Sequence, residues 1–210
     1  RSAHKRILSI DLIRGFSIVF MVLVHFAIFF GDEDAGRSFA VIFLDHCLAD
    51  WGAAVFLMTM GMSQVLSARR MEKPDNWLLF KRALVRGIYI FGVGLLMLAL
   101  AWGLDQIWWW DILTLMGVGT IVLFFCRFLP SWSLIGVIVA IMVLTPWFRG
   151  AFNLAADWEF VANPVISQYL PGMYIEPTVE YHPAILKGLF LSGYFPVFPW
   201  IAFTIIGFVM

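Results

Sequence analysis

The chain has 210 residues, of which 62% are hydrophobic and only 13% are charged, and its mean hydropathy is +0.89. A soluble domain carries roughly twice that share of charged residues, and one soluble core cannot bury this much apolar surface. Lys and Arg together number 14, as do Asp and Glu, so no net positive charge is available to attract nucleic acid. This composition excludes a soluble enzyme, a disordered protein and a disulfide scaffold, and it makes the lipid bilayer the expected solvent.

Uncharged stretches divide the chain into candidate membrane spans. A helix needs about 20 apolar residues to cross the hydrocarbon, and the backbone in lipid must satisfy its own hydrogen bonds. We predict an all-α polytopic bundle of about six spans, forming one membrane domain over residues 1–210 and belonging to a larger bundle. The helices are expected near 10–31, 50–69, 80–104, 108–127, 130–148 and 188–210, with a long outer loop at 149–187. Trp108–Trp110 are expected to lengthen the short fourth helix, Ile112–Cys126.

The basic residues predict the orientation. The N-terminal segment, residues 69–86 and Arg127 together hold 11 of the 14 Lys and Arg residues. Because loops rich in Lys and Arg stay on the cytoplasmic side, we predict a cytoplasmic N-terminus. The first helix is expected to be retained rather than cleaved as a signal peptide, since no small-residue cleavage site follows Phe30.

The first helix carries ionisable residues on one stripe. At 100° per residue, Arg14 and His25 point within about 20° of each other and lie roughly 16 Å apart along the axis. Asp11 is close enough to pair with Arg14 at i,i+3. Ionisable groups at membrane depth usually face the bundle interior. A cofactor-organising ion pair and a reactive imidazole are one interpretation, and an interfacial anchor with a satisfied histidine is the other.

Two further helices carry candidate polar sites. His46 and Asp50 are spaced i,i+4, so the carboxylate can orient the imidazole as a general base requires; a water-exposed pair at a helix entry is the alternative. Arg82 and Arg86 share a face of the third helix and suit phosphate groups, although arginines there are also ordinary snorkelling anchors. Asp111 is expected to be an N-cap or part of an outer polar site.

Other features have structural interpretations. Gly92 and Gly94 are expected to allow close helix packing rather than to bind a nucleotide, since no strand precedes them. Cys47 and Cys126 are interpreted as small hydrophobic residues rather than a bridge. The sequence has no Walker loop, GxSxG or HExxH motif and no metal-spaced set of cysteines and histidines, so we predict no metal site.

Four stretches together resemble one known family. They are RILSIDLIRGFSIVFMVLVH (Arg6–His25), ADWGAAVFLMTMG (Ala49–Gly61), DILTLMGVG (Asp111–Gly119) and GYFPVFPWIAFTIIGFVM (Gly193–Met210). In this order they resemble the catalytic membrane domain of heparan-alpha-glucosaminide N-acetyltransferase and its bacterial relatives of unassigned substrate. The resemblance spans nearly the whole chain and implies a multi-pass acyltransferase of a bacterial inner membrane.

The resemblance also implies a reaction. An acetyl or other acyl group would pass from cytoplasmic acyl-CoA to an amino sugar, glycan or envelope acceptor on the other side of the membrane. The inner arginines Arg14, Arg82 and Arg86, with Asp11 organising the first of them, would contact the CoA phosphates.

In that family a histidine in the outer loop before the second helix is central to the chemistry. His46 lies in this loop, but it is nearer to Asp50 than the family pattern would place it. His25, at the end of the first helix, is therefore the substitute candidate for the reactive imidazole.

Two functions of different classes follow. The first is a membrane acyltransferase that modifies an extracytoplasmic acceptor. The second is a non-catalytic subunit or scaffold that packs against other membrane proteins, and a transporter is a third, weaker reading. Binding of acyl-CoA separates the first two, because a scaffold would instead co-purify with stoichiometric partners.

The predicted orientation is testable by cysteine labelling. A single cysteine introduced at Asn163 should react with an impermeant maleimide added to intact cells, and one introduced at Asp75 should not, because loops rich in Lys and Arg stay inside. The reverse pattern would overturn the assigned topology.

Overall fold

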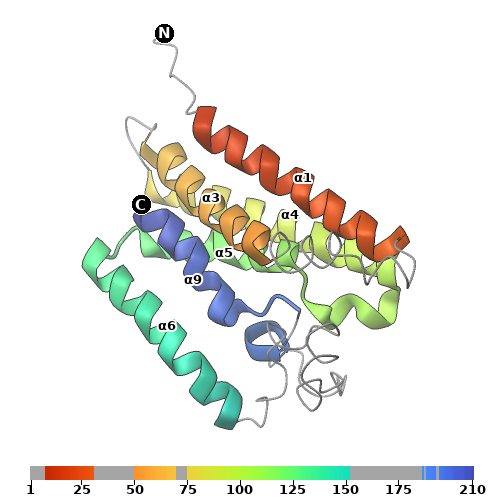
Figure 1. The fold of residues 1–210 in the computed structure, drawn as a ribbon. Helices are drawn as coiled ribbons and strands as arrows, with labels where there is room; N and C mark the ends of the chain where they lie inside the picture. Colours follow the sequence, from red (N-terminus) through yellow and green to blue (C-terminus); the bar gives the residue numbers. More distant parts are fainter. Residues whose placement is uncertain (1–7, 31–49, 70–74, 152–185, 187, 193) are drawn as a thin grey trace.

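A computed structural model describes residues 8–30, 50–69, 75–151, 186, 188–192 and 194–210, and these residues form helices and connections without a β-strand (Figure 1). The elements are α1 Leu8–Phe30, α3 Asp50–Arg69, α4 Asn76–Trp102, the 3-10 segment η3 Leu104–Trp109, α5 Ile112–Cys126, α6 Ser131–Ala151, the π-helical segment η4 Gly188–Ser192 and α9 Val197–Val209. The predicted all-α helical bundle is therefore confirmed.

Four of these helices, α1, α3, α4 and α6, are long and apolar enough to cross a membrane, whereas α5 and α9 are apolar but shorter. In Figure 1, α1, α4 and α6 run in one direction and α3, α5 and α9 run in the other. The helix pairs α4–α5 and α3–α9 pack most extensively, and α1 lies along α3 at the edge of the bundle.

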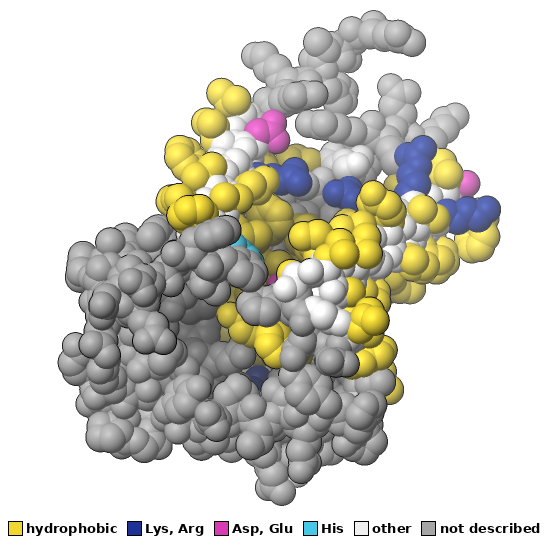
Figure 2. Space-filling view, turned by 90° about the vertical axis from the view of Figure 1, so that its right-hand side faces the viewer, with side chains coloured by type: hydrophobic (Ala, Val, Ile, Leu, Met, Phe, Trp, Pro, Cys, Tyr) yellow, Lys and Arg dark blue, Asp and Glu magenta, His cyan; other side chains and the backbone are white. Residues whose placement is uncertain are grey.

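The bundle has two chemically different ends. The basic end is where α1 and α4 begin, and its described cations are Arg14, Lys81, Arg82, Arg86 and Arg127. Figure 2 shows dark blue Lys and Arg side chains gathered across the upper part of one face, above a mostly yellow apolar surface. The histidine end is the opposite one, where α1 finishes near His25 and α5 begins after Asp111.

The side chains are distributed as a lipid environment requires. Large apolar residues point outward, as Phe16 (60% exposed), Leu100 (74%) and Trp132 (77%) illustrate. Hydroxyl groups are buried instead, and those of Thr59 and Thr120 donate to carbonyl oxygens of the preceding turn at 2.8 Å. The hydroxyl groups of Thr59 and Thr120 are thus satisfied inside the bundle while apolar surface faces outward, which is the arrangement that hydrocarbon favours.

Glycines bring two helix pairs into backbone contact. A Cβ built on Gly61 of α3 would meet the backbone of Thr204 and Phe208 in α9, and one built on Gly207 would meet the backbone of Met58. A Cβ on Gly87 of α4 would lie 2.8 Å from the carbonyl oxygen of Gly117 in α5. Small residues permit such close approach where no hydrophobic effect drives association.

Several predictions about packing have a clear outcome. Gly94 packs closely, since a Cβ there would lie 2.9 Å from the amide nitrogen of Thr114, whereas Gly92 has nothing within 4 Å and its predicted role is wrong. Cys126 is buried and free, as expected, and Cys47 lies outside the described residues.

Two predicted helix boundaries are corrected. Trp108–Trp110 do not extend α5, because α4 ends at Gly103 (φ 96°), the chain forms η3, and Trp110 takes a positive φ of 56° before α5 begins. The expected helix over 188–210 is divided, because Tyr194 and Phe195 donate backbone hydrogen bonds to Trp109 and Trp110 and so leave the helix.

The glycine contact between α3 and α9 predicts a sharp difference between two substitutions. Gly207→Ala should lower the melting temperature by several degrees, because overpacking against backbone costs about 1–3 kcal/mol. The matched change Gly52→Ala, in α3 where a Cβ meets nothing within 4 Å, should leave it unchanged or slightly raised. Thermal unfolding of the detergent-solubilised protein measures both, and equal melting temperatures would contradict the backbone contact.

Candidate functional site

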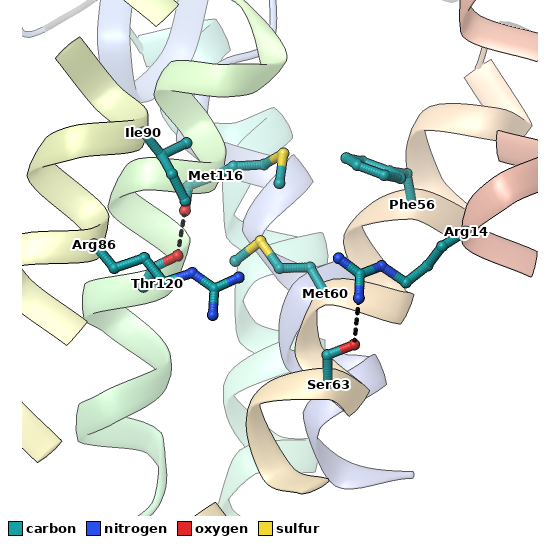
Figure 3. Close-up of a pocket in the computed structure, with 8 residues that line it drawn as sticks. All are labelled: Arg14, Phe56, Met60, Ser63, Arg86, Ile90, Met116 and Thr120. Atoms are coloured by element: carbon teal, nitrogen blue, oxygen red, sulfur yellow. Dashed lines mark hydrogen bonds between the residues drawn. The ribbon is translucent and has the colours of Figure 1, made fainter. Parts of the chain in front are cut away.

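A small pocket opens at the basic end between four helices (Figure 3). It has a volume of about 20 Å³, which is room for a water molecule or two rather than for a nucleotide. Its lining residues are Arg14 of α1, Phe56, Met60 and Ser63 of α3, Arg86 and Ile90 of α4, and Met116 and Thr120 of α5. The pocket thus joins segments that are far apart in the sequence.

Two guanidinium groups enter this pocket from opposite sides. Figure 3 shows the side chains of Arg14 and Arg86 extending toward each other across the gap, with Met60 between them. Arg14 is half-buried and donates from Nη1 to the Ser63 hydroxyl at 3.4 Å, and Ser63 in turn donates to the Thr59 carbonyl oxygen at 2.7 Å. Ser63 is neutral, so this hydrogen bond does not offset the positive charge of Arg14, and no ion pair of Arg14 is formed within the described part of the chain.

The expected pair of Asp11 with Arg14 is not formed among the described residues. Asp11 is exposed, and the hydrogen-bond partner of Arg14 is Ser63 on α3. The physical reason is the 60° offset between positions i and i+3 on a helix. Arg14 faces the neighbouring helix, while Asp11 faces away from the pocket.

Of the two arginines of the third helix that the sequence singled out, one lies at the pocket. Arg86 lines the pocket, while Arg82, one turn nearer the start of α4, does not. No hydrogen bond or ion pair involves Arg86 within the described part of the chain. Arg86 therefore offers an exposed guanidinium with its donors available, at the mouth of a pocket that Arg14 enters from the other side.

Two hydroxyl-bearing residues of the pocket were not singled out from the sequence. Ser63 lies one or two turns from Met60 and Phe56, at spacings of three and seven, so it shares a helix face with them. Thr120 likewise lies one turn from Met116. A hydroxyl on the same stripe as methionines, in an otherwise apolar helix, is the signal that could have identified both.

The histidine end carries a second polar cluster. The Nδ1 atom of His25 lies 2.7 Å from the Met21 carbonyl oxygen, which can only accept, so Nδ1 is the donor in this hydrogen bond. His25 also interacts electrostatically with the carboxylate of Asp111. An imidazole within electrostatic range of a carboxylate is an arrangement suited to a general base.

Asp111 has the capping role that was expected as one of its two alternatives. Its Oδ1 accepts a hydrogen bond from the amide of Ile112 at 2.7 Å, so it caps α5. Its carboxylate also lies within electrostatic range of His25. His46 lies outside the described residues, and Asp50 is described only as the first residue of α3, at the same end of the bundle. Their predicted pairing therefore stays a prediction.

A comparison with protein families matches residues 6–210 to the family described as heparan-alpha-glucosaminide N-acetyltransferase, catalytic. The chain belongs to this family. The comparisons with curated proteins and with solved structures gave no match. Membership in the heparan-alpha-glucosaminide N-acetyltransferase family, together with the apolar helices, identifies an integral membrane protein of acetyltransferase type.

The heparan-alpha-glucosaminide N-acetyltransferase family and the two ends of the bundle agree in chemical terms. Acetyl transfer in general needs a donor site and a group that accepts a proton. The basic end supplies cationic donors, and the histidine end supplies an imidazole with a carboxylate. Within the described ranges, no cluster of three or more His, Cys, Asp or Glu side chains could hold a metal ion.

Proposed function

We propose that this chain transfers an acyl group, most simply acetyl, from acyl-CoA at the basic end to an acceptor at the histidine end. The observation that carries the proposal is the convergence of Arg14 and Arg86 on one pocket. Among the described residues the half-buried guanidinium of Arg14 has a neutral partner, and an anion would compensate its charge, since an uncompensated charge at membrane depth is costly. The phosphates of CoA are such anions, and a guanidinium binds two phosphate oxygens at once.

The orientation is part of the same proposal. The basic end faces the cytoplasm, where acyl-CoA is made, because most Lys and Arg residues lie there. The acceptor is a glycan or another envelope component on the far side of a bacterial inner membrane. An amino sugar is the acceptor class that fits the name of the family.

The distance between the basic end and the histidine end is short enough for one acyl transfer reaction to use both. Arg14 and His25 belong to the same helix and lie roughly 16 Å apart along it. Phosphates held near Arg14 and Arg86 would leave the acylated arm of CoA directed into the bundle, toward His25. The acceptor would then meet the thioester at the histidine end.

The histidine end supports acid–base chemistry. The acceptor amine or hydroxyl would form a bond to the thioester carbonyl carbon, and its proton would pass to Nε2 of His25. The carbon–sulfur bond would then break, and the same proton would go to the CoA sulfur. Asp111 would stabilise the imidazolium that forms between these two steps, as the electrostatic interaction of the two groups suggests.

Donor binding requires the pocket to widen, because about 20 Å³ cannot hold the arm of CoA. Helix α1 is the element best able to move. It packs mainly on α3 and carries exposed apolar residues along much of its length. Outward movement of α1 would separate Arg14 from Met60 and open the gap without disturbing the glycine contacts of α3 and α4.

Replacing Arg86 should weaken donor binding. Loss of one charge-assisted contact costs about 1.5–3 kcal/mol, so Arg86→Ala should raise the CoA dissociation constant by roughly tenfold or more. The matched control is Lys81→Ala, a cation of the same helix end whose ammonium lies 4.9 Å from the Trp77 ring and outside the pocket. Isothermal titration with CoA measures both variants.

Two results would oppose the donor site. Arg86→Ala with wild-type affinity would return Arg86 to the role of an interfacial anchor. A wild-type protein that binds no CoA and co-purifies with a stoichiometric membrane partner would favour the scaffold instead.

The identity of the base is tested by two histidine variants. With His25 as the base, His25→Gln should abolish acetyl transfer and leave CoA affinity unchanged, because the residue lies far from the arginines. Asp111→Asn should slow transfer by a smaller factor, since an asparagine still accepts from Ile112 but no longer stabilises an imidazolium. Acetylation of glucosamine by acetyl-CoA in proteoliposomes is the measurement.

His46→Ala and Asp50→Asn complete this experiment. If His46→Ala abolishes transfer while His25→Gln retains it, the base is His46, with Asp50 as its orienting carboxylate. If neither histidine variant affects transfer, both assignments are wrong.

A further inference from the structure

Helix α4 has an outward face on which a lysine precedes a stripe of apolar side chains. At 100° per residue, Trp77, Val85 and Ile88 all point within about 40° of Lys81. Lys81 is exposed, and the other three side chains are 61%, 67% and 60% exposed. Trp77 precedes Lys81 at the start of α4, whereas Val85 and Ile88 follow it toward the middle of the helix. This face therefore has an aromatic and cationic end and an apolar continuation.

Gly92 interrupts the apolar part of this face. It points within about 20° of Lys81 and lies roughly 16 Å from it along the helix axis. A Cβ built on Gly92 would meet nothing within 4 Å, and the side chains one turn to either side, Ile88 and Leu96, are both exposed. An acyl chain can therefore approach the backbone more closely at Gly92 than beside either neighbour.

Stacked aromatic rings support Lys81 at the basic end. Its ammonium nitrogen lies 4.9 Å from the centroid of the Trp77 ring, which is a cation–π contact, and Trp77 stacks on Phe80 with centroids 5.9 Å apart. Tryptophan side chains favour the boundary between hydrocarbon and water, where one end of the ring system is apolar and the other is wet. The exposed Trp77 ring therefore places the Lys81 ammonium near the level of lipid headgroups.

The same end holds a second cation on aromatic rings. Phe80 contacts Phe124 of α5 with centroids 5.3 Å apart, and the guanidinium carbon of Arg127 lies 5.7 and 5.6 Å from the rings of Phe124 and Phe128. Aromatic contacts thus connect Lys81 to Arg127. Figure 2 shows the Lys and Arg side chains of this end gathered above apolar surface.

The described charges at the start of α4 and the end of α5 favour an anionic partner. Lys81, Arg82 and Arg127 are cationic, and Asp75 is acidic. The Asp75 carboxylate is used as the N-cap of α4, where it accepts from the Trp77 amide at 3.0 Å. The balance of charge among these residues is positive, and basic residues near the membrane surface attract anionic lipid headgroups.

We propose that this face of α4 binds one anionic phospholipid, with its phosphate at Lys81 and one acyl chain along Val85, Ile88 and Gly92. Half of the hydrocarbon is about 15 Å thick, which matches the roughly 16 Å from Lys81 to Gly92. An acyl chain of one leaflet therefore ends near Gly92 when its headgroup lies at Lys81. A protein partner would have to bring an acidic group to the hydrocarbon boundary, whereas every anionic phospholipid has one there. The proposal does not depend on acyl transfer.

Exchange of Lys81 tests the headgroup contact. The detergent-solubilised protein is titrated with anionic phosphatidylglycerol and with phosphatidylcholine, which has no net charge, and bound lipid is counted by native mass spectrometry. The wild-type protein should prefer phosphatidylglycerol. Lys81→Gln should weaken phosphatidylglycerol binding about fivefold, the effect of one basic residue near an anionic surface, and leave phosphatidylcholine binding unchanged. Lys81→Arg keeps the charge and should retain the preference.

Substitution of Gly92 tests the acyl-chain contact. Gly92→Leu fills the space beside the α4 backbone and should weaken the binding of both lipids, because their acyl chains are the same. The matched control is Gly136→Leu in α6, where a Cβ also meets nothing within 4 Å, and it should bind both lipids as the wild-type protein does. Neither variant should lower the melting temperature, since leucine is a better helix former than glycine.

Four results would overturn the inference. They are equal wild-type affinity for the two lipids, Lys81→Gln with wild-type phosphatidylglycerol binding, Gly92→Leu with wild-type binding of both lipids, and displacement of phosphatidylglycerol by saturating CoA. The last result would place the lipid in the pocket of Arg14 and Arg86, which Lys81 and Gly92 do not line. A protein that shows the expected lipid pattern but binds no CoA would support the lipid site while the proposed donor site fails.

Discussion

The backbone contact between α3 and α9 at Gly61 and Gly207 determines how the rest of the bundle is arranged. Because Gly61 faces α9, Met60 and Ser63, which point about 100° and 160° away from it around α3, are turned toward the pocket between α1, α4 and α5. Ser63 is then the residue that meets Arg14. The glycine contact between α4 and α5 acts in the same way, since Gly87 faces α5 and its neighbour Arg86 reaches the pocket. Two close helix crossings therefore bring two distant arginines together.

Much of the helical architecture could be predicted from charge and hydropathy. The uncharged stretches locate α1, α3, α4 and α6 well, because a helix that faces lipid cannot carry charge along its length. The irregular segments could not be predicted in this way. Trp108–Trp110 are apolar, and hydropathy contains no information about the positive φ values of Gly103 and Trp110 that end one helix and delay the next.

Some residues of the candidate site could likewise be predicted from the sequence, and others could not. Helical periodicity placed Arg14 and Arg86 on faces that can converge, and it correctly marked Asp111 as a cap. The predicted pair of Asp11 with Arg14 was wrong, because Arg14 bonds to Ser63 on another helix instead. Sequence spacing describes only contacts within one helix. The partners from α3 and α5, Ser63 and Thr120, depend on how helices cross. That crossing is set by glycine contacts that a single sequence does not reveal.

Unequal helix lengths explain why the histidine end holds a polar cluster. Gly94 of α4 lies level with Thr114 of α5; from there α4 continues for eight residues to Trp102, whereas α5 extends only two residues back to Ile112. The difference of six residues corresponds to about 9 Å along the helix axis. Helix α5, with 15 residues, and α9, with 13, span only about 22 and 20 Å, less than the roughly 30 Å of the hydrocarbon.

The 3-10 segment η3 and the π-helical segment η4 lie where these two helices stop short. Irregular backbone at membrane depth is stable only when protein covers it or it lines a wet cavity. At this end the backbone of Trp109 and Trp110 is satisfied by Tyr194 and Phe195 rather than by a continued helix. The Asp111 carboxylate, which caps α5, therefore lies below the end of α4, whereas His25 is exposed on α1. There, where water competes more weakly than at the surface, the carboxylate of Asp111 acts more strongly on a developing charge.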